Sequence, residues 1–232
     1  MPTYSPDPRT AFAENRLLPE SAKKAGGRLI PGCWVDPSPA VAGLLRETLD
    51  LAREHGIRVL KTSCDGWAGK SSADPASWGR ALTRNMERIL EYVRAAGAVF
   101  QVHTGHDRSH VRLVEKLVRF AGEGITFHLV HLGGCVSGQF YLLPRLREWT
   151  DEGLDVVTDT SMASGFAVRW SLRLARTNPA VANRVLFASD APWGTFESEI
   201  SKVLATVGSG TTIVRKVLFD NAARVYMTRS SG

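Results

Sequence analysis

Side chains that can catalyse reactions follow short apolar runs at three points in the chain. His103 follows VFQV, His131 follows FHLV and Asp190 follows VLFAS. In parallel α/β folds, ligands and reacting groups gather just beyond the carboxyl ends of the strands. Imidazole and carboxylate groups placed there can move protons or bind a divalent cation. The sequence therefore predicts that these three residues lie together on one rim of a parallel sheet.

Asp159 is a fourth polar residue that directly follows an apolar run, LDVVT. Consecutive members of the series His103, His131, Asp159 and Asp190 are separated by about 28 to 31 residues. This is the length of one βα unit. Consecutive βα units form either an open doubly wound sheet or a barrel. Because chemically active residues end nearly every strand, instead of gathering at one switch point, the barrel is favoured.

The hydrophobic pattern predicts six strands, all parallel, separated by amphipathic helices. The strands are expected at residues 28–36, 57–62, 98–102, 125–130, 154–157 and 184–188, and the later helices at 80–96, 111–121, 141–151, 166–176, 197–205 and 213–219. We predict an N-terminal segment with a helix (1–27), followed by one domain (28–232). Its fold class is α/β, a TIM-barrel-like (β/α) fold that is incomplete because it has about six strands instead of eight.

Composition narrows the class of protein. The chain has 232 residues, of which 44% are hydrophobic and 22% charged, as in an ordinary soluble domain. Apolar runs are strand-sized and the N-terminus has no apolar signal core, so we expect a cytoplasmic protein that does not bind membranes. The net charge is +6, but its basic residues are dispersed among acidic ones, which argues against nucleic-acid binding. Three cysteines are too few and too scattered for a disulfide framework.

Seven short motifs together resemble those of one enzyme family. They are VDP at 35–37, VLK at 59–61, VHTG at 102–105, VHLGG at 130–134, DTS at 159–161, LFASDAPWG at 186–194 and NAARVY at 221–226. In this order they resemble the amidohydrolase-related family, which comprises metal-dependent TIM-barrel hydrolases and decarboxylases and includes relatives of aminocarboxymuconate semialdehyde decarboxylase. The resemblance covers residues 28–226 and implies the same barrel.

The resemblance also implies roles for particular residues. His103 matches a metal ligand, Asp190 the carboxylate that completes the site, and His131 a histidine that assists the reaction and is a possible third ligand. The family's first strand carries an HxH pair that has no counterpart in this sequence, so its first two strands are expected to be absent. The metal is expected to be divalent, zinc above all, with a donor set one or two ligands short of a tetrahedral site.

These residues suggest a function. A bound metal lowers the pKa of its water, a carboxylate accepts the proton, and a second imidazole protonates the leaving group. We expect a metal-dependent hydrolase or decarboxylase that acts on a small, carboxylated molecule. The alternative is a catalytically inactive, truncated barrel that binds a ligand or a partner subunit.

Other polar and aromatic residues are candidates for substrate contacts. Lys61 could pair with an anionic substrate or form a buried ion pair, and His106 could contact substrate or lie in a solvated loop. Asp159 could support a neighbouring site residue or cap its own strand, and Trp193 could line the pocket or only pack. His128 lies three residues before His131, so strand alternation places it on the opposite face, in a structural role.

The strand count also bears on assembly. Two missing strands would leave a gap between the first and last strands, where apolar side chains and unpaired backbone groups are exposed. The polar, proline-interrupted segment 1–27 is a poor cover for it. We therefore expect a homodimer, or a complex with a partner that covers the gap.

Overall fold

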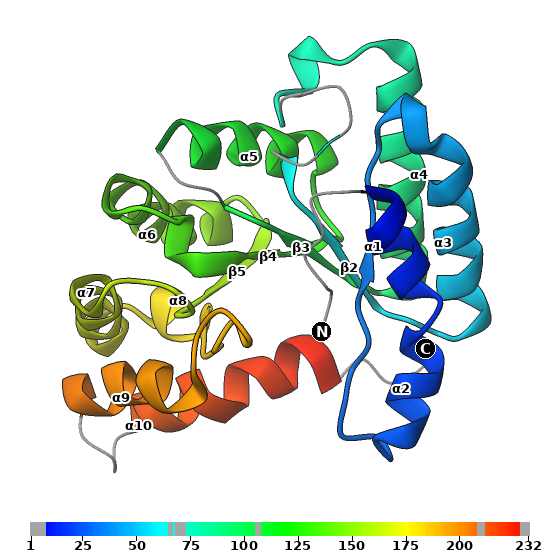
Figure 1. Cartoon of the computed structure of the whole chain (residues 1–232). Helices are drawn as coiled ribbons and strands as arrows, with labels where there is room; N and C mark the ends of the chain where they lie inside the picture. Colours follow the sequence, from blue (N-terminus) through cyan, green and yellow to red (C-terminus); the bar gives the residue numbers. More distant parts are fainter. Residues whose placement is uncertain (1–7, 65–66, 68–72, 105–107, 208–211, 228–232) are drawn as a thin grey trace. The chain divides into compact units, whose positions relative to one another are not determined.

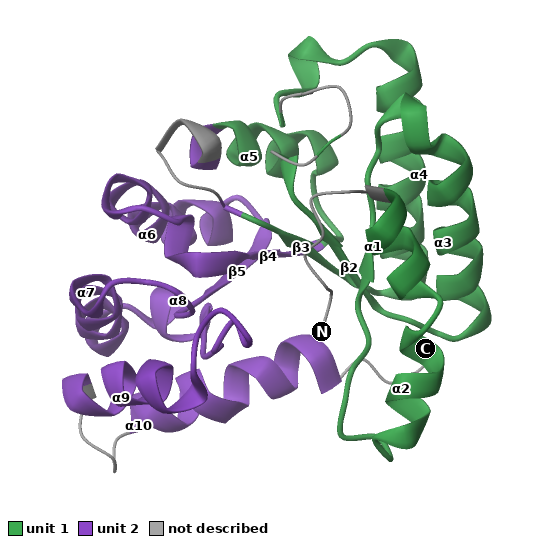
Figure 2. Cartoon of the chain, in the orientation of Figure 1, with its two compact units in different colours: residues 1–103, 113–125 green, residues 104–112, 126–232 purple. Residues whose placement is uncertain are grey.

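The computed structural model describes residues 8–64, 67, 73–104, 108–207 and 212–227. Parallel strands alternate with helices along the chain (Figure 1). The chain divides into two compact units (Figure 2), of which unit 1 comprises residues 1–103 and 113–125, and unit 2 comprises residues 104–112 and 126–232. Each unit contributes three of the six strands, as the sequence predicts in number and direction.

Unit 1 is built on three neighbouring parallel strands. These are β1 (Cys33–Trp34), β2 (Val59–Thr62) and β3 (Val99–Val102), with Leu60 of β2 opposite Cys33 on one side and Phe100 on the other. Its helices are α1 (Pro8–Asn15), α2 (Leu18–Lys24), α3 (Ala42–Glu54) and α4 (Arg80–Ala96), and α5 (Arg108–Ala121) ends in it.

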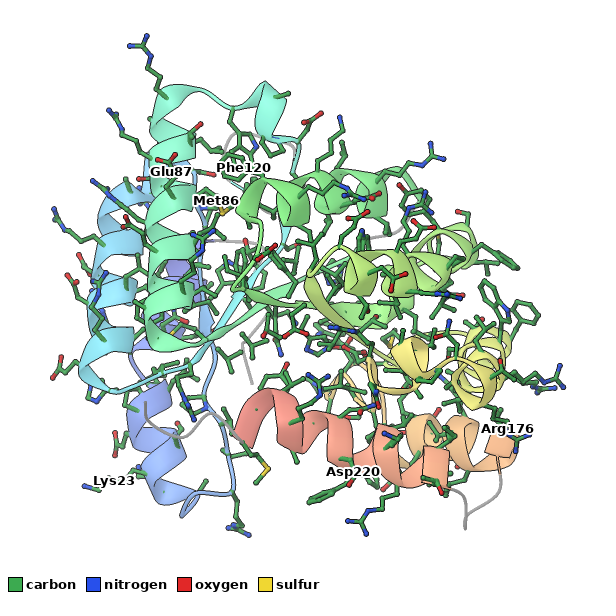
Figure 3. The ribbon with its side chains drawn as sticks, turned by 180° about the vertical axis from the view of Figure 1, so that it is seen from behind. Lys23, Met86, Glu87, Phe120, Arg176 and Asp220 are labelled. Carbon is green, nitrogen blue, oxygen red and sulfur yellow. The ribbon has the colours of Figure 1, made fainter. Side chains whose placement is uncertain are left out.

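Helix α4 shows why these segments fold as they do. Apolar residues recur every three or four positions, so Met86, Ile89 and Val93 form one buried face. Figure 3 shows Glu87 on the outer side of this helix, next to Met86 on the inner side. The helix ends at Gly97, whose φ of 56° is a left-handed conformation that glycine adopts without steric cost.

Unit 2 repeats this arrangement and carries the carboxyl-terminal part of the chain. Its strands are β4 (Thr126–Leu129), β5 (Asp155–Asp159) and β6 (Val185–Leu186), with β5 between the other two. Its helices are α6 (Val136–Asp151), α7 (Gly165–Thr177), α8 (Pro179–Ala182), α9 (Phe196–Val207) and α10 (Thr212–Arg215). Two π-helical segments, Lys216–Asp220 and Ala223–Met227, follow α10.

The last strand is shorter than predicted, and the neighbouring backbone explains why. The apolar run extends over residues 184–188, but β6 includes only Val185 and Leu186. The ladder with β5 ends where the backbone N–H of Thr160 donates to the carbonyl of Leu186 at 3.0 Å. The backbone N–H of Phe187 faces away from β5 and donates to the carbonyl of Val217, in the first π-helical segment, at 2.9 Å. Asp190 consequently lies in a turn beyond the strand.

Helix α6 begins earlier than predicted. The glycine-containing stretch before residue 141 was expected to be a loop, yet the helix begins at Val136. Cys135 caps it, because its sulfur accepts a hydrogen bond from the backbone N–H of Gly138 at 3.3 Å.

No helix formed by the described residues is long and apolar enough to cross a bilayer.

Candidate active site at the ends of β4, β5 and β6

The turn after β4 places His131 in an unusual backbone conformation. The strand ends at Leu129, and a short 3₁₀ segment, Val130–Gly133, follows it. His131 has φ 69° and ψ 28°, and Leu132 has φ 51°. Residues other than glycine rarely adopt this left-handed region, and they persist in it where surrounding contacts hold them.

Asp159 supplies those contacts from the end of β5. Its Oδ1 accepts hydrogen bonds from the backbone N–H of His131 at 3.3 Å and from that of Ser161 at 2.8 Å, and also from the Ser161 hydroxyl. Its Oδ2 lies 2.8 Å from Nε2 of His128. The residue is only 1% exposed, so these donors replace the water that a carboxylate requires.

The protonation state of Asp159 follows from these neighbours. Burial alone would raise the pKa of this carboxyl group. The hydrogen bond and positive charge of His128, the charge of His131 and the hydrogen bond from Ser161 outweigh burial and hold the pKa well below its usual range. Asp159 is therefore a carboxylate that only accepts hydrogen bonds.

These contacts also determine which nitrogen of neutral His131 carries the proton. Nδ1 lies 2.8 Å from Oγ of Ser161 and 3.2 Å from the Ser161 carbonyl oxygen. The hydroxyl donates its own proton to Asp159, and a carbonyl oxygen can only accept, so Nδ1 must donate. Nε2 of the neutral ring is then unprotonated and available to take a proton.

Asp190 lies opposite Nε2 of His131. Its Oδ2 is 4.0 Å from Nε2 of His131, and the side chains of the histidine and the aspartate are 9% and 24% exposed. Asp190 also has a left-handed backbone, with φ 52°. The pair is accessible enough to meet a small molecule, and close enough for the carboxylate to stabilise a protonated imidazole.

A partly buried ion pair connects the turn after β5, which follows Ser161, to the turn after β6, which carries Asp190. Nζ of Lys202, on α9, donates to Oε1 of Glu199 at 2.6 Å and to the carbonyl of Ala163 at 3.1 Å, in the turn after Ser161. Glu199 also packs against Gly194 in the turn after Asp190. Helix α9 therefore helps to set the spacing between the His131 and Asp190 sides of the site.

The structure corrects the placement of His128. Strand alternation was expected to turn it to the face opposite His131, but its ring bonds to Asp159, the carboxylate that also holds the His131 turn. Alternation does not extend to His131 because β4 ends at Leu129 and the next residues have left-handed backbones. Nδ1 of His128 lies 2.5 Å from the hydroxyl of Tyr226.

Two residues in this network, Ser161 and Tyr226, had no assigned role at the level of sequence, and His128 was assigned only a structural one. Ser161 and Tyr226 lie in the motifs DTS and NAARVY, and His128 lies within the apolar run of β4. Their motifs drew attention to Ser161 and Tyr226. His128 and Tyr226 are 98 residues apart in the sequence, so their contact leaves no local pattern in it.

The other predicted site residues are placed as follows. His103, directly after β3, and Lys61, in β2, belong to unit 1, and both are partly exposed. His106 lies outside the described residues. Trp193 is 68% exposed, in the turn after Asp190. The predicted rim of His103, His131 and Asp190 thus remains a prediction, with its last two members brought together.

Comparison with known proteins identifies the family. The family model described as amidohydrolase matches residues 5–227, which is nearly the whole chain. The chain belongs to the amidohydrolase family. This confirms the resemblance inferred from the motifs. Among curated proteins, no sequence matches this family member.

Solved structures agree on the fold of this amidohydrolase-family chain. The 2,6-dihydroxybenzoate decarboxylase from Rhizobium superposes with a TM-score of 0.64 at 16% identity, covering 95% of this chain and 79% of that one. A dihydroxybenzoic acid decarboxylase from Polaromonas sp. JS666, with bound manganese and the inhibitor 2-nitroresorcinol, gives 0.63 at 14% identity, covering 94% and 76%. These likenesses, together with the parallel strands, confirm the α/β fold as an incomplete barrel type.

Members of this family bind a divalent metal, so the His131–Asp190 pair is a candidate for part of a metal site. The nitrogen of His131 and the carboxylate of Asp190 are suitable ligands for Zn²⁺ or Mn²⁺. Catalytic zinc sites use three protein ligands, whereas the described residues contain no group of three or more His, Cys, Asp or Glu that could hold a metal ion. The described residues of this amidohydrolase-family chain therefore do not complete a metal site, and His131 and Asp190 are the groups that can move protons there.

Proposed function

We propose that this chain is a decarboxylase or hydrolase of the amidohydrolase family that acts on a small, carboxylated molecule. His131 and Asp190 form its acid–base pair. One observation carries the proposal: Nε2 of His131 faces Asp190 at 4.0 Å while Nδ1 is held by Ser161. A fixed tautomer whose Nε2 faces a partly exposed carboxylate is an arrangement that suits general acid–base catalysis.

For decarboxylation of an aromatic acid, protonated Nε2 of His131 is the acid. The ring carbon that bears the carboxylate uses a π electron pair to take this proton, forming a C–H bond. The C–C bond to the carboxylate then breaks, its electron pair restores the aromatic ring, and CO₂ leaves. Asp190 stabilises the imidazolium before transfer, and the neutral ring afterwards regains a proton from solvent.

For hydrolysis, the same nitrogen starts in its neutral form. Nε2 of His131 takes a proton from water as the oxygen attacks a carbonyl carbon, and Asp190 stabilises the imidazolium that forms. The proton then passes to the leaving group as its bond to carbon breaks. Both reactions depend on the tautomer that Ser161 and Asp159 impose.

Aromatic acids are the first substrates to test. Two structural relatives carry the names of dihydroxybenzoate decarboxylases, and one of them was solved with 2,6-dihydroxybenzoate. At 14 to 16% identity this likeness concerns the fold, so it supports the choice of a probe. Contacts of Lys61, His106 and Trp193 with such a substrate remain predictions.

The experiment is an assay of the full chain with 2,6-dihydroxybenzoate, in which release of CO₂ and formation of resorcinol are followed together. Parallel reactions contain EDTA, Mn²⁺ or Zn²⁺, which tests the expected metal dependence. N-acyl amino acids serve as carboxylated substrates for hydrolysis. We expect turnover of at least one class of substrate, and none of either class under any metal condition would overturn the proposal.

A non-catalytic role is the second candidate, and the incomplete donor set among the described residues favours it. In this case the barrel binds a carboxylated ligand or a partner subunit without converting it. Calorimetric titration with 2,6-dihydroxybenzoate separates the two functions, because binding without any product in the same sample supports the second candidate.

A further inference from the structure

A chain of buried polar contacts extends from His131 to the carboxyl-terminal segment. Nε2 of His128 lies 2.8 Å from Asp159, and Nδ1 of the same ring lies 2.5 Å from the hydroxyl of Tyr226. The rings of His128 and Tyr226 also meet edge to face, with centroids 6.0 Å apart. Tyr226 belongs to the second π-helical segment. All the residues that make these polar contacts lie in unit 2.

The direction of the inner contacts does not depend on the charge of His128. Asp159 is a carboxylate, so Nε2 of His128 donates to it whether the ring is neutral or protonated. In the neutral ring Nδ1 accepts from the Tyr226 hydroxyl, and in the protonated ring Nδ1 donates to the same oxygen. In both states Tyr226 occupies the second nitrogen and prevents the ring from turning.

The orientation of Asp159 depends in turn on the His128 ring. Its Oδ2 is held by His128, while its Oδ1 holds Ser161 and the backbone N–H of His131. If the carboxylate rotates, its Oδ1 no longer accepts the proton of the Ser161 hydroxyl. The hydroxyl can then donate to Nδ1 of His131, so this nitrogen no longer has to carry the proton. The left-handed backbone of His131 makes this turn dependent on its contacts.

We propose that Tyr226 is a positioning residue for His131, acting through His128, Asp159 and Ser161. Its hydroxyl fixes the His128 ring, and the fixed ring keeps Asp159 oriented so that the neutral His131 ring carries its proton on Nδ1 and directs Nε2 at Asp190. The catalytic consequence rests on the proposed function of the His131–Asp190 pair, whereas the effect on the tautomer of His131 does not.

The test is Tyr226→Phe, which keeps the ring and removes only the hydroxyl. The ¹⁵N NMR spectrum of the histidine rings is recorded on the full chain, with the His131 signals assigned from His131→Asn. Wild type should show His131 as a single tautomer with the proton on Nδ1. In Tyr226→Phe the His131 nitrogens should move towards averaged shifts, which report exchange between tautomers.

The matched control is Tyr141→Phe. Tyr141 lies in the same unit, where its ring stacks with Arg112 and Arg145, and is not part of the polar chain. Its variant should reproduce the wild-type His131 spectrum. On any substrate that wild type converts, Tyr226→Phe should lower kcat about tenfold with little change in KM, as is typical when a group that orients a reacting residue is removed.

A folded Tyr226→Phe protein with an unchanged His131 spectrum would overturn the proposal, and so would a changed spectrum with unchanged kcat on a converted substrate. If Tyr226→Phe does not fold, His128→Gln and His128→Leu decide. Glutamine can donate to Asp159 and accept from Tyr226, so it should preserve the His131 tautomer, whereas leucine should not. Equal His131 spectra in these two variants would contradict the proposal. Failure of the proposed function would instead appear as absence of turnover with the predicted spectra intact.

Discussion

At the scale of residues, the two proposed reacting groups share a backbone feature that their chemistry does not require. His131 and Asp190 both have positive φ, at 69° and 52°. A left-handed conformation costs an L-residue other than glycine about 1–2 kcal/mol, less for aspartate. The fold tolerates this cost at two residues that lie opposite each other, which fits a site where function, not stability, determines residue type.

This argument predicts opposite effects of Asp190→Gly on stability and on activity. Glycine relieves the left-handed backbone, whereas Asp190→Ala keeps the strain and also loses the carboxylate. We expect Asp190→Gly to be more stable than Asp190→Ala by about 1 kcal/mol, although kcat falls at least about tenfold in both variants. Urea denaturation monitored by circular dichroism gives the free energies of unfolding. Equal values for the two variants would show that the backbone relaxes and that no strain is stored at this position.

The sequence pointed to the two residues of the proposed acid–base pair but not to the residues that contact them. His131 and Asp190 were identified because each follows an apolar run, and this pattern is local. His128 was assigned to the wrong face because the period of two residues was extended past the end of β4. Tyr226 could not be assigned at all, because its partner is 98 residues away and only the fold brings them together.

At the scale of elements, the position of the site depends on the contacts between helix α9 and the turns after β5 and β6. Lys202 is the ion-pair partner of Glu199, whose side chain is 4% exposed and whose Oε2 has no hydrogen-bond partner among the described residues. Removing one member of a buried pair leaves the other charge without compensation.

Lys202→Met should therefore lower the free energy of unfolding by about 3 kcal/mol. The double variant Glu199→Gln, Lys202→Met should recover part of this loss, because no buried charge remains. Lys216→Met is the control, since the Lys216 ammonium donates to the Asn183 side chain at an exposed position and its loss should change stability by less than about 0.5 kcal/mol. Chemical denaturation measures all three. A Lys202→Met protein as stable as the control would mean that Glu199 is protonated or hydrated instead of paired.

Element boundaries show where local sequence signals end. The prediction for α4, residues 80–96, matches the structure because its apolar spacing and terminal glycine are local features. The predicted strand 184–188 was too long because its ladder with β5 ends at Leu186, and the N–H of Phe187 on the other side bonds to Val217, a residue distant in sequence. The start of α6 was missed because a cysteine cap at residue 135 has no strong sequence signature.

At the scale of the whole molecule, the regular spacing of βα units was sufficient to predict the fold class. Each unit buries one strand and one helix face, so the spacing of strand ends is determined by chain geometry and survives at low sequence identity. The family resemblance and the incomplete barrel are confirmed. The homodimer, or a partner covering the barrel gap, stays a prediction, as do zinc and the cytoplasmic location.

The central claim is that Nε2 of His131 carries the proton in the reaction, with Asp190 opposite it. The most direct test is kcat for wild type, His131→Asn and Asp190→Asn on whichever carboxylated substrate is converted, with His55→Asn as a control on the surface of unit 1. We predict that His131→Asn lowers kcat at least about 100-fold, that Asp190→Asn lowers it about tenfold, and that His55→Asn leaves it unchanged. A folded His131→Asn enzyme that retains the wild-type kcat would contradict this account.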